Sequence, residues 1–190
     1  MDTYQLTLPL LSIETAPNEA KEFLADAQKA YGMVPNMYAG MANAPGILST
    51  YLHGYKLFRQ NSGFTPAEQE VVFLSISRVN GCSYCVAAHS MVAAMMSNVP
   101  ADVIKALRNG SAIADPRLSA LGNFTTLMVE KRGNPSTDDV QAFLAAGFSE
   151  CLVLEIVLAI AVKTLSNYSN HLFHTPVDDT FASFHWPETK

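Results

Sequence analysis

The chain has 190 residues, a formal net charge of -5 at pH 7 and a sequence pI near 5.4. Hydrophobic residues make up 49% of it and charged residues 15%, which favours a large core with further apolar surface buried between subunits. It contains no run of Lys or Arg, so the composition argues against nucleic acid and anionic membrane surfaces as partners.

The N-terminal residues lack a basic stretch followed by a long apolar one, so no signal peptide is expected. The most apolar segment, residues 151–165, contains Glu155 and Lys163 and is too short to span a bilayer. We therefore expect a cytoplasmic protein, in which structural disulfides are rare. Two of the three cysteines form a CxxC pattern, which in a reducing compartment indicates redox or metal chemistry.

Helical periodicity dominates the chain from residue 17 onward. Residues 1–16 are predicted to form an N-terminal arm. Helices are predicted from about 17 to 31, through Met41, and from 45 to 60. A capping box at 65–68 begins a helix that ends at 80–81, and another runs from 82 to just before Pro100. Further helices are expected over 100–109, 117–131, 137–146 and 149–171. No segment alternates like a strand, so the fold class is all-α, with one domain over 17–176 and a tail over 177–190.

An internal repeat can be read from the polar positions. Adding 85 to the numbers of Glu70, Cys82, Cys85 and His89 leads to Glu155, Asn167, Asn170 and His174. A competing offset of 84 aligns residues 63–65 with 147–149, so an insertion or deletion is needed. We interpret residues 63–98 as a two-helix unit and residues 147–176 as its degenerate second copy, which has lost the thiols.

Four residues carry the candidate chemistry. Spacings of three and four place Cys82, Cys85 and His89 on one helical face. The two cysteines can close a disulfide, and a helix N-terminus stabilises a thiolate there. If the two helices pack antiparallel, Glu70 lies near His89 and can hold its tautomer, which would complete a Cys/His/Glu relay.

The pattern of a Glu, eleven residues and then CxxCxxxH over 70–89 resembles the alkylhydroperoxidase D-like branch of the carboxymuconolactone decarboxylase family. The resemblance implies an all-helical, trimeric or hexameric protein that reduces small organic hydroperoxides without a metal or bound cofactor. A dithiol protein or small thiol would supply the electrons. By resemblance, Cys85 is the thiol served by His89 and Glu70. Cys82 is the more accessible thiol, which closes the disulfide and meets the reductant. Some members have His between the cysteines, where this chain has Tyr84.

Other functions use the same residues. A protein disulfide reductase would need the same CxxC, and a lactone decarboxylase-type enzyme would use His89 or His174 as a base. A structural zinc site would need a fourth ligand beyond Cys82, Cys85 and His89, and inert packing cysteines are a further alternative.

Four remaining features carry expectations of their own. Glu155 lies in an apolar run and is expected to need a partner across a subunit or repeat interface. Cys151 is expected to be a packing cysteine, and His171 and His174 are expected to be helix-end or interface residues. The aromatic tail at 184–186 is expected to dock on a neighbouring subunit.

Overall fold

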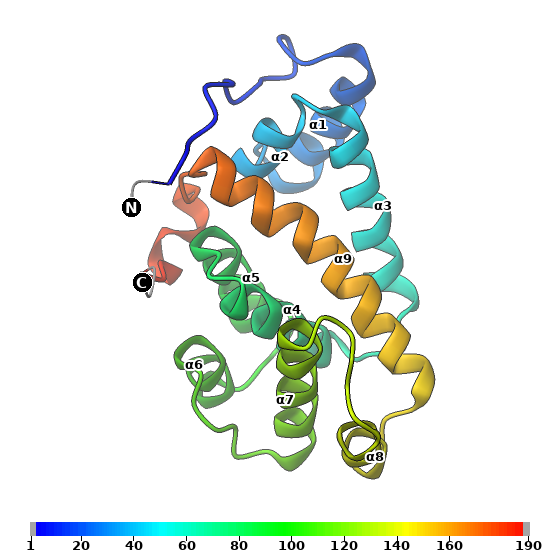
Figure 1. Ribbon diagram of the computed structural model, residues 1–190. Coiled ribbons are helices and arrows are strands. Elements are labelled where there is room, and N and C mark those ends of the chain that lie inside the picture. The colour runs from blue at the N-terminus through cyan, green and yellow to red at the C-terminus, as the bar shows by residue number, and fades with distance from the viewer. Residues whose placement is uncertain (1–2, 188–190) are drawn as a thin grey trace.

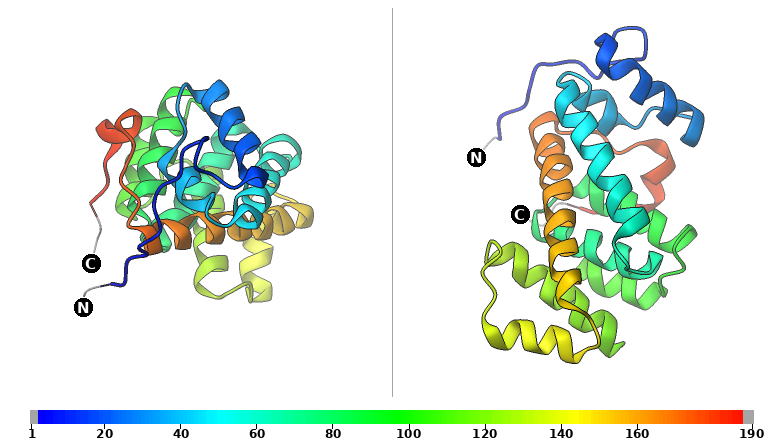
Figure 2. Two further views of the ribbon diagram at one scale, coloured as in Figure 1. Left: turned by 90° about the horizontal axis from the view of Figure 1, so that it is seen from above. Right: turned by 90° about the vertical axis from the view of Figure 1, so that its right-hand side faces the viewer.

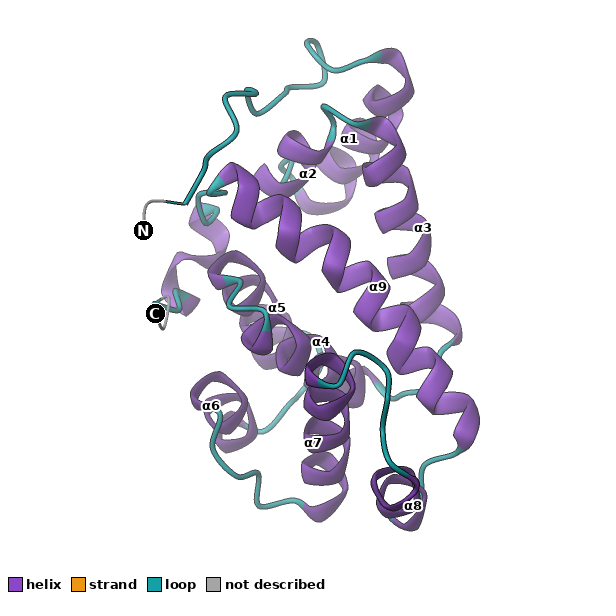
Figure 3. Ribbon diagram, viewed as in Figure 1, coloured by secondary structure: helices purple, strands orange, loops and turns teal. Residues whose placement is uncertain are grey.

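The structure is a computed structural model that describes residues 3–187. It contains helices and no strand over that range, which confirms the all-α prediction (Figure 3). The first helices are α1 (Asn18–Tyr31), α2 (Asn36–Met41), α3 (Pro45–Asn61) and α4 (Pro66–Val79). They are followed by α5 (Ser83–Met95), α6 (Ala101–Asn109), α7 (Pro116–Glu130), α8 (Thr137–Ala145) and α9 (Glu150–Phe173). A short 3-10 helix, Asp179–Phe184, comes last.

Helices α4, α5 and α9 form the centre of the molecule, with α1 to α3 towards one end and α6 to α8 towards the other (Figure 1). Helix α4 packs mainly against α7 and α5, and also against α9 and α6. Every residue of α4 from Glu68 to Ser77 is buried. A polar side chain on this helix therefore needs a partner inside the protein.

Local sequence signals define both ends of α4. At its start the Thr65 hydroxyl accepts from the Glu68 amide, and the Glu68 carboxylate accepts from the Thr65 amide at 2.9 Å. At its end Gly81 has a φ of +70°, a left-handed conformation that favours glycine. The Gly81 amide donates to Arg78 and the Cys82 amide to Ser77, which is the Schellman arrangement. The chain thus reverses directly into α5.

Helices α3 and α9 run side by side, as Figure 2 also shows from two further directions. Gly54 permits their close approach, because a Cβ at this position would lie 2.8 Å from Cγ2 of Val162. The tight crossing brings the tyrosines of α3 next to the buried face of α9.

The predicted second copy over residues 147–176 corresponds to a single continuous helix of 24 residues, without a turn like that between α4 and α5. The internal duplication therefore remains a prediction from the matching sequence positions. Among residues 3–187, α9 is the one helix whose length and composition would suffice to cross a bilayer. Its buried face, however, carries Lys163, Asn167 and Asn170, all directed into the fold.

Two expectations about surface features were wrong. The aromatic tail docks on its own chain, since Trp186 is 5% exposed and its indole nitrogen donates to the Arg108 carbonyl at 3.0 Å. The Arg108 guanidinium in turn donates to the carbonyls of Phe184 and His185. Cys151 is exposed rather than packed, because it lies on the outer face of α9. Residues 1–2 of the predicted arm and 188–190 of the tail lie outside the described residues.

Candidate active site

The turn between α4 and α5 sets the position of the dithiol. Cys82 closes the Schellman arrangement of α4 and is also the N-cap of α5, so two helix ends fix its backbone. Cys85 lies one turn further on, within the first turn of α5, where the helix dipole favours a negative side chain.

Both thiols are free and buried, and they share one hydrogen-bond donor. The Asn170 side-chain nitrogen lies 3.3 Å from Sγ of Cys85 and 3.7 Å from Sγ of Cys82. Its neighbour on α9, Asn167, accepts from the Asn80 side chain at 2.9 Å. Helix α9 therefore holds both the turn that precedes the dithiol and the sulfur atoms themselves.

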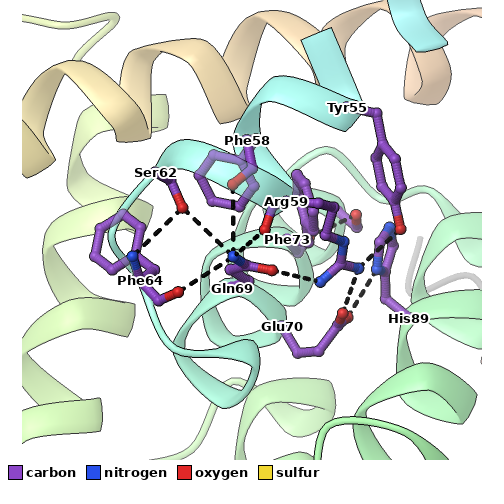
Figure 4. Close-up of polar contacts among 10 residues, drawn as sticks. Tyr55, Phe58, Arg59, Ser62, Phe64, Gln69, Glu70, Phe73 and His89 are labelled. Carbon is purple, nitrogen blue, oxygen red and sulfur yellow. Dashed lines mark hydrogen bonds and ion pairs between the residues drawn. The ribbon is translucent and has the colours of Figure 1, made fainter. Parts of the chain in front are cut away.

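Glu70 and His89 form the contact expected from the sequence. The Nδ1 atom of His89 lies 2.8 Å from Oε2 of Glu70, and both side chains are buried (Figure 4). Since a carboxylate can only accept, Nδ1 is the donor, and Nε2 is left free to accept a proton.

Arg59 of α3 completes this network from the other side (Figure 4). Its guanidinium forms an ion pair with Oε1 of Glu70 and donates to the Tyr55 hydroxyl at 2.8 Å and to the Gln69 side chain at 3.1 Å. The fully buried Glu70 carboxylate thus has a charged partner and a hydrogen-bond donor, as burial of a charge requires.

These contacts decide the protonation of the Glu70–His89 pair. Burial raises the pKa of Glu70, but His89 and Arg59 outweigh burial, and the pKa lies below its usual 4.5. Burial and the nearby positive charge of Lys163 lower the pKa of His89 below its usual 6.5, although Glu70 acts in the opposite direction. At neutral pH the pair is therefore a carboxylate and a neutral imidazole, which can act as a base.

The pKa values of the two thiols move in opposite directions. Burial raises the pKa of Cys85, but a hydrogen bond from Cys82, the positive charge of Lys163 and the charge of His89 in its protonated form outweigh it, so the pKa lies well below 9.0. Burial and the adjacent Cys85 raise the pKa of Cys82 well above that value. Cys85 is therefore the thiol that ionises first, and Cys82 is the thiol that donates to its sulfur.

Lys163 lies in this site, although the sequence analysis assigned it no role there. It lies on α9, is 0% exposed, and its Nζ has no hydrogen-bond partner among residues 3–187. Nζ lies 5.6 Å from the centre of the Phe73 ring. An ionisable residue within the apolar run of α9 was the signal that could have identified it.

An apolar cavity of about 290 Å³ reaches Cys85, His89 and Lys163. Its walls come from α2, α3, α5 and the 3-10 helix, and much of the lining consists of aromatic and Met side chains, among them Tyr38, Tyr51, Tyr55, Met37, Met91 and Phe181. Burial raises the pKa of Tyr55 to about 12, so its phenol stays neutral. The cavity suits a small, largely non-polar molecule.

Cys82 lines a different cavity, of about 570 Å³ and more polar in character. Other residues around it include Asn80, Asn170, His171, His174 and His185. Tyr84 lines both cavities, and its hydroxyl donates to Asp178 at 2.5 Å. Each thiol of the CxxC is therefore reached from its own cavity.

The structure brings all four predicted residues into one site, while their catalytic roles remain predictions. The expectation that Cys82 is the more accessible thiol is not met, because both thiols are buried, Cys82 at 1% exposed and Cys85 at 2%. Asn170 covers both sulfur atoms. The zinc alternative lacks a ligand set, since no three His, Cys, Asp or Glu side chains within residues 3–187 converge on a metal position.

The fold and the site place the chain in a class of all-α proteins. Proteins of this class hold a buried dithiol beside an imidazole–carboxylate pair. Residues 48–125 match the model of the carboxymuconolactone decarboxylase family. This segment, 78 of the 190 residues, contains Glu70, Cys82, Cys85 and His89. No curated protein matches the chain significantly.

Three solved structures have the same fold. An alkylhydroperoxidase AhpD core, a peroxidase-related protein from Ralstonia eutropha JMP134, is 23% identical with a TM-score of 0.81, over 92% of this chain and 93% of that one. A peroxidase-related protein from Silicibacter sp. TM1040 is 20% identical with a TM-score of 0.78, over 94% and 93%. A cysteine-to-alanine variant of the debrominase Bmp8, in complex with 2,3,4-tribromopyrrole, is 16% identical with a TM-score of 0.76, over 96% and 97%.

Proposed function

We propose that the protein is a thiol-dependent peroxidase that reduces small organic hydroperoxides through a Cys82–Cys85 dithiol/disulfide cycle. The observation that carries this proposal is the position of Cys85. Its sulfur lies in the first turn of α5, within hydrogen-bond distance of Asn170, and lines the same apolar cavity as His89. An apolar peroxide in that cavity meets a thiolate and a base together.

In the first half of the cycle, the Cys85 proton passes to His89, and the thiolate attacks the terminal oxygen of the hydroperoxide. The sulfur–oxygen bond forms as the oxygen–oxygen bond breaks, which oxidises Cys85 to a sulfenic acid and reduces the peroxide. The leaving alkoxide takes the proton from His89 and departs as an alcohol. Glu70 keeps the imidazole oriented throughout, because it accepts from Nδ1.

In the second half, the sulfur of Cys82 attacks the sulfenic sulfur of Cys85. The Cys82 proton and the sulfenic hydroxyl leave as water, and the disulfide forms. Two external thiol groups then return the pair to the dithiol and become a disulfide themselves. The first external thiol attacks Cys82, since the thiol of lower pKa, Cys85, is the better leaving group.

We propose that the electron donor reaches Cys82 through the polar cavity that Cys82 lines. Because Cys82 is only 1% exposed, a donor must be a small thiol or a dithiol on a narrow arm. A broad protein surface with a recessed thiol would not reach the sulfur atom.

The test is the intact mass of the reduced protein before and after one equivalent of cumene hydroperoxide, in a Cys151→Ser background. That background removes the exposed third thiol, which lies on the outer face of α9. We expect a rapid loss of about 2 Da, mapped to a Cys82–Cys85 disulfide.

Two variants make this test specific. Cys85→Ser should abolish the reaction, whereas Cys82→Ser should stop it at the sulfenic acid, with a gain of about 16 Da. Full peroxide reduction by Cys85→Ser would refute the assignment. A disulfide that forms only with an oxidised protein partner would favour the disulfide reductase alternative, and turnover of a lactone substrate without either thiol would favour the decarboxylase-type one.

A second candidate function is reductive dehalogenation of a small aromatic compound. The observation that favours it is the debrominase of the same fold, together with an apolar, tyrosine-rich cavity beside Cys85. One aryl bromide and the dithiol would yield the debrominated ring, bromide, a proton and the Cys82–Cys85 disulfide. Release of bromide from 2,3,4-tribromopyrrole by the reduced protein would support this candidate, and a lack of release would exclude that substrate.

We also propose that the protein assembles as a homotrimer or homohexamer, as the resemblance implies. Four apolar side chains on α9 support this: Leu154, Val157, Tyr168 and Leu172 are 70%, 45%, 57% and 47% exposed. Light scattering of the purified protein tests the proposal, and a monomeric mass at micromolar concentration would contradict it.

A further inference from the structure

Lys163 is a fully buried lysine whose ammonium has no hydrogen-bond partner among the described residues. It extends from α9 to the wall of the apolar cavity, which it shares with Cys85 and His89. The Phe73 ring lies below it at 5.6 Å. A cation in such surroundings is strongly destabilised unless a negative charge lies close by.

Few groups around the cavity can supply that charge. No Asp or Glu lines it. Glu70 already has both its oxygens engaged, one by Arg59 and one by His89. Burial raises the pKa of Tyr51 and Tyr55 above 10, so these phenols stay neutral. Among the acidic groups that line the cavity, the thiol of Cys85 is the one whose pKa is lowered.

We propose that Lys163 is the counter-ion of the Cys85 thiolate, a positioning residue that stabilises the reduced, ionised form of the dithiol. The proposal deepens the function proposed above, since it concerns the same thiol, but it does not require that the oxidant be a hydroperoxide. Lys163 is among the groups that lower the pKa of Cys85, and it lowers that of His89 as well.

The redox cycle then changes the charge around Lys163. In the dithiol state the ammonium faces a thiolate, so the two charges cancel. When the disulfide forms, two electrons leave the sulfur pair, the thiolate charge disappears and the ammonium is left uncompensated. Lys163 therefore stabilises the reduced state relative to the oxidised one, and makes the disulfide more oxidising.

The first test is the pH titration of thiolate absorbance in reduced protein, in a Cys151→Ser background. Lys163→Met should raise the pKa of Cys85 by at least about one unit, a roughly tenfold loss of thiolate below that pKa. Lys163→Arg should restore much of the thiolate, and Lys105→Met, at an exposed lysine of α6, should change nothing. An unchanged titration in Lys163→Met would overturn the proposal.

The second test is the thiol–disulfide equilibrium against a reference dithiol, which requires no peroxide. Loss of the cation should shift this equilibrium about tenfold towards the disulfide for each unit by which the pKa of Cys85 rises. Lys163→Gln is measured in parallel, so that a folding defect of one variant does not decide the result. If a folded Lys163 variant shows the same thiol–disulfide equilibrium as Lys105→Met, the counter-ion proposal is also refuted.

These measurements distinguish a failure of the counter-ion proposal from a failure of the proposed peroxidase function. A shifted titration in a protein that does not reduce hydroperoxides would leave Lys163 as the counter-ion and remove the peroxidase assignment. Peroxide reduction together with an unshifted titration would retain the peroxidase assignment and exclude Lys163 as the counter-ion.

Discussion

Glu70→Gln should destabilise the protein far more than the same change two residues earlier in α4. Glu70 is 0% exposed and contacts both the Arg59 guanidinium and His89. The amide keeps the shape of the side chain but removes its charge. Arg59 is then left without a charged partner, and Nδ1 of His89 faces either an amide oxygen or an amide nitrogen.

The magnitude follows from burial. Removal of one member of a buried ion pair costs about 3–5 kcal/mol in unfolding free energy. For a domain of this size that lowers the melting temperature by roughly 6–20 °C. Glu68→Gln is the matched control. This variant retains the capping box and loses the ion pair to Arg117, whose side chain is 45% exposed. Loss of an ion pair so exposed to solvent costs less than about 1 kcal/mol in unfolding free energy.

The assay is thermal unfolding followed by circular dichroism, with both variants at neutral pH. Equal melting temperatures for Glu70→Gln and Glu68→Gln would refute the reasoning that Glu70 is the buried ionic centre. The pH dependence adds a second check. Because the pKa of Glu70 is lower in the folded state than its usual 4.5, its stabilisation is complete above that pH and is lost as the pH falls through the folded value. The stability gap between the wild type and Glu70→Gln should therefore narrow in acid.

Three further outcomes are expected. Gly54→Ala should lower the melting temperature, because overpacking costs about 1–3 kcal/mol, whereas Gly46→Ala, which meets no atom within 4 Å, should be neutral or stabilising. Gly81→Ala has open space around its Cβ but a positive φ, so calorimetry should show a loss of about 1–2 kcal/mol from the backbone alone. In alkylation with peptide mapping, Cys85 should be labelled at pH values well below 9.0, where Cys82 is not; preferential labelling of Cys82 would contradict the direction of the two pKa values.

Sequence patterns predicted the helices and the Glu70–His89 contact because both depend on local rules. The capping box and the Asn80-Gly81 signal placed the ends of α4 within about one residue of where the structure has them. Two helices joined by so short a turn must return antiparallel, which brings a residue near the middle of α4 alongside the second turn of α5.

Residues from distant helices could not be predicted in the same way. Arg59, Lys163 and Asn170 reach the dithiol site from α3 and α9, and their positions depend on how these helices cross α4 and α5. Periodicity assigns each residue to a helical face but does not define the crossing. The burial of Cys82 was missed for the same reason, since the group that covers it, Asn170, is 88 positions away in sequence.

The two separate cavities have a consequence for how specificity can diverge in this fold. In the proposed cycle the oxidant would meet residues of α2, α3 and α5, such as Met37 and Met91, whereas the donor would meet residues at the end of α9. Substitutions in one lining need not disturb the other, because the disulfide alone links the two half-reactions. A change of oxidant, from a peroxide to an aryl halide for example, can then proceed while the source of electrons is retained.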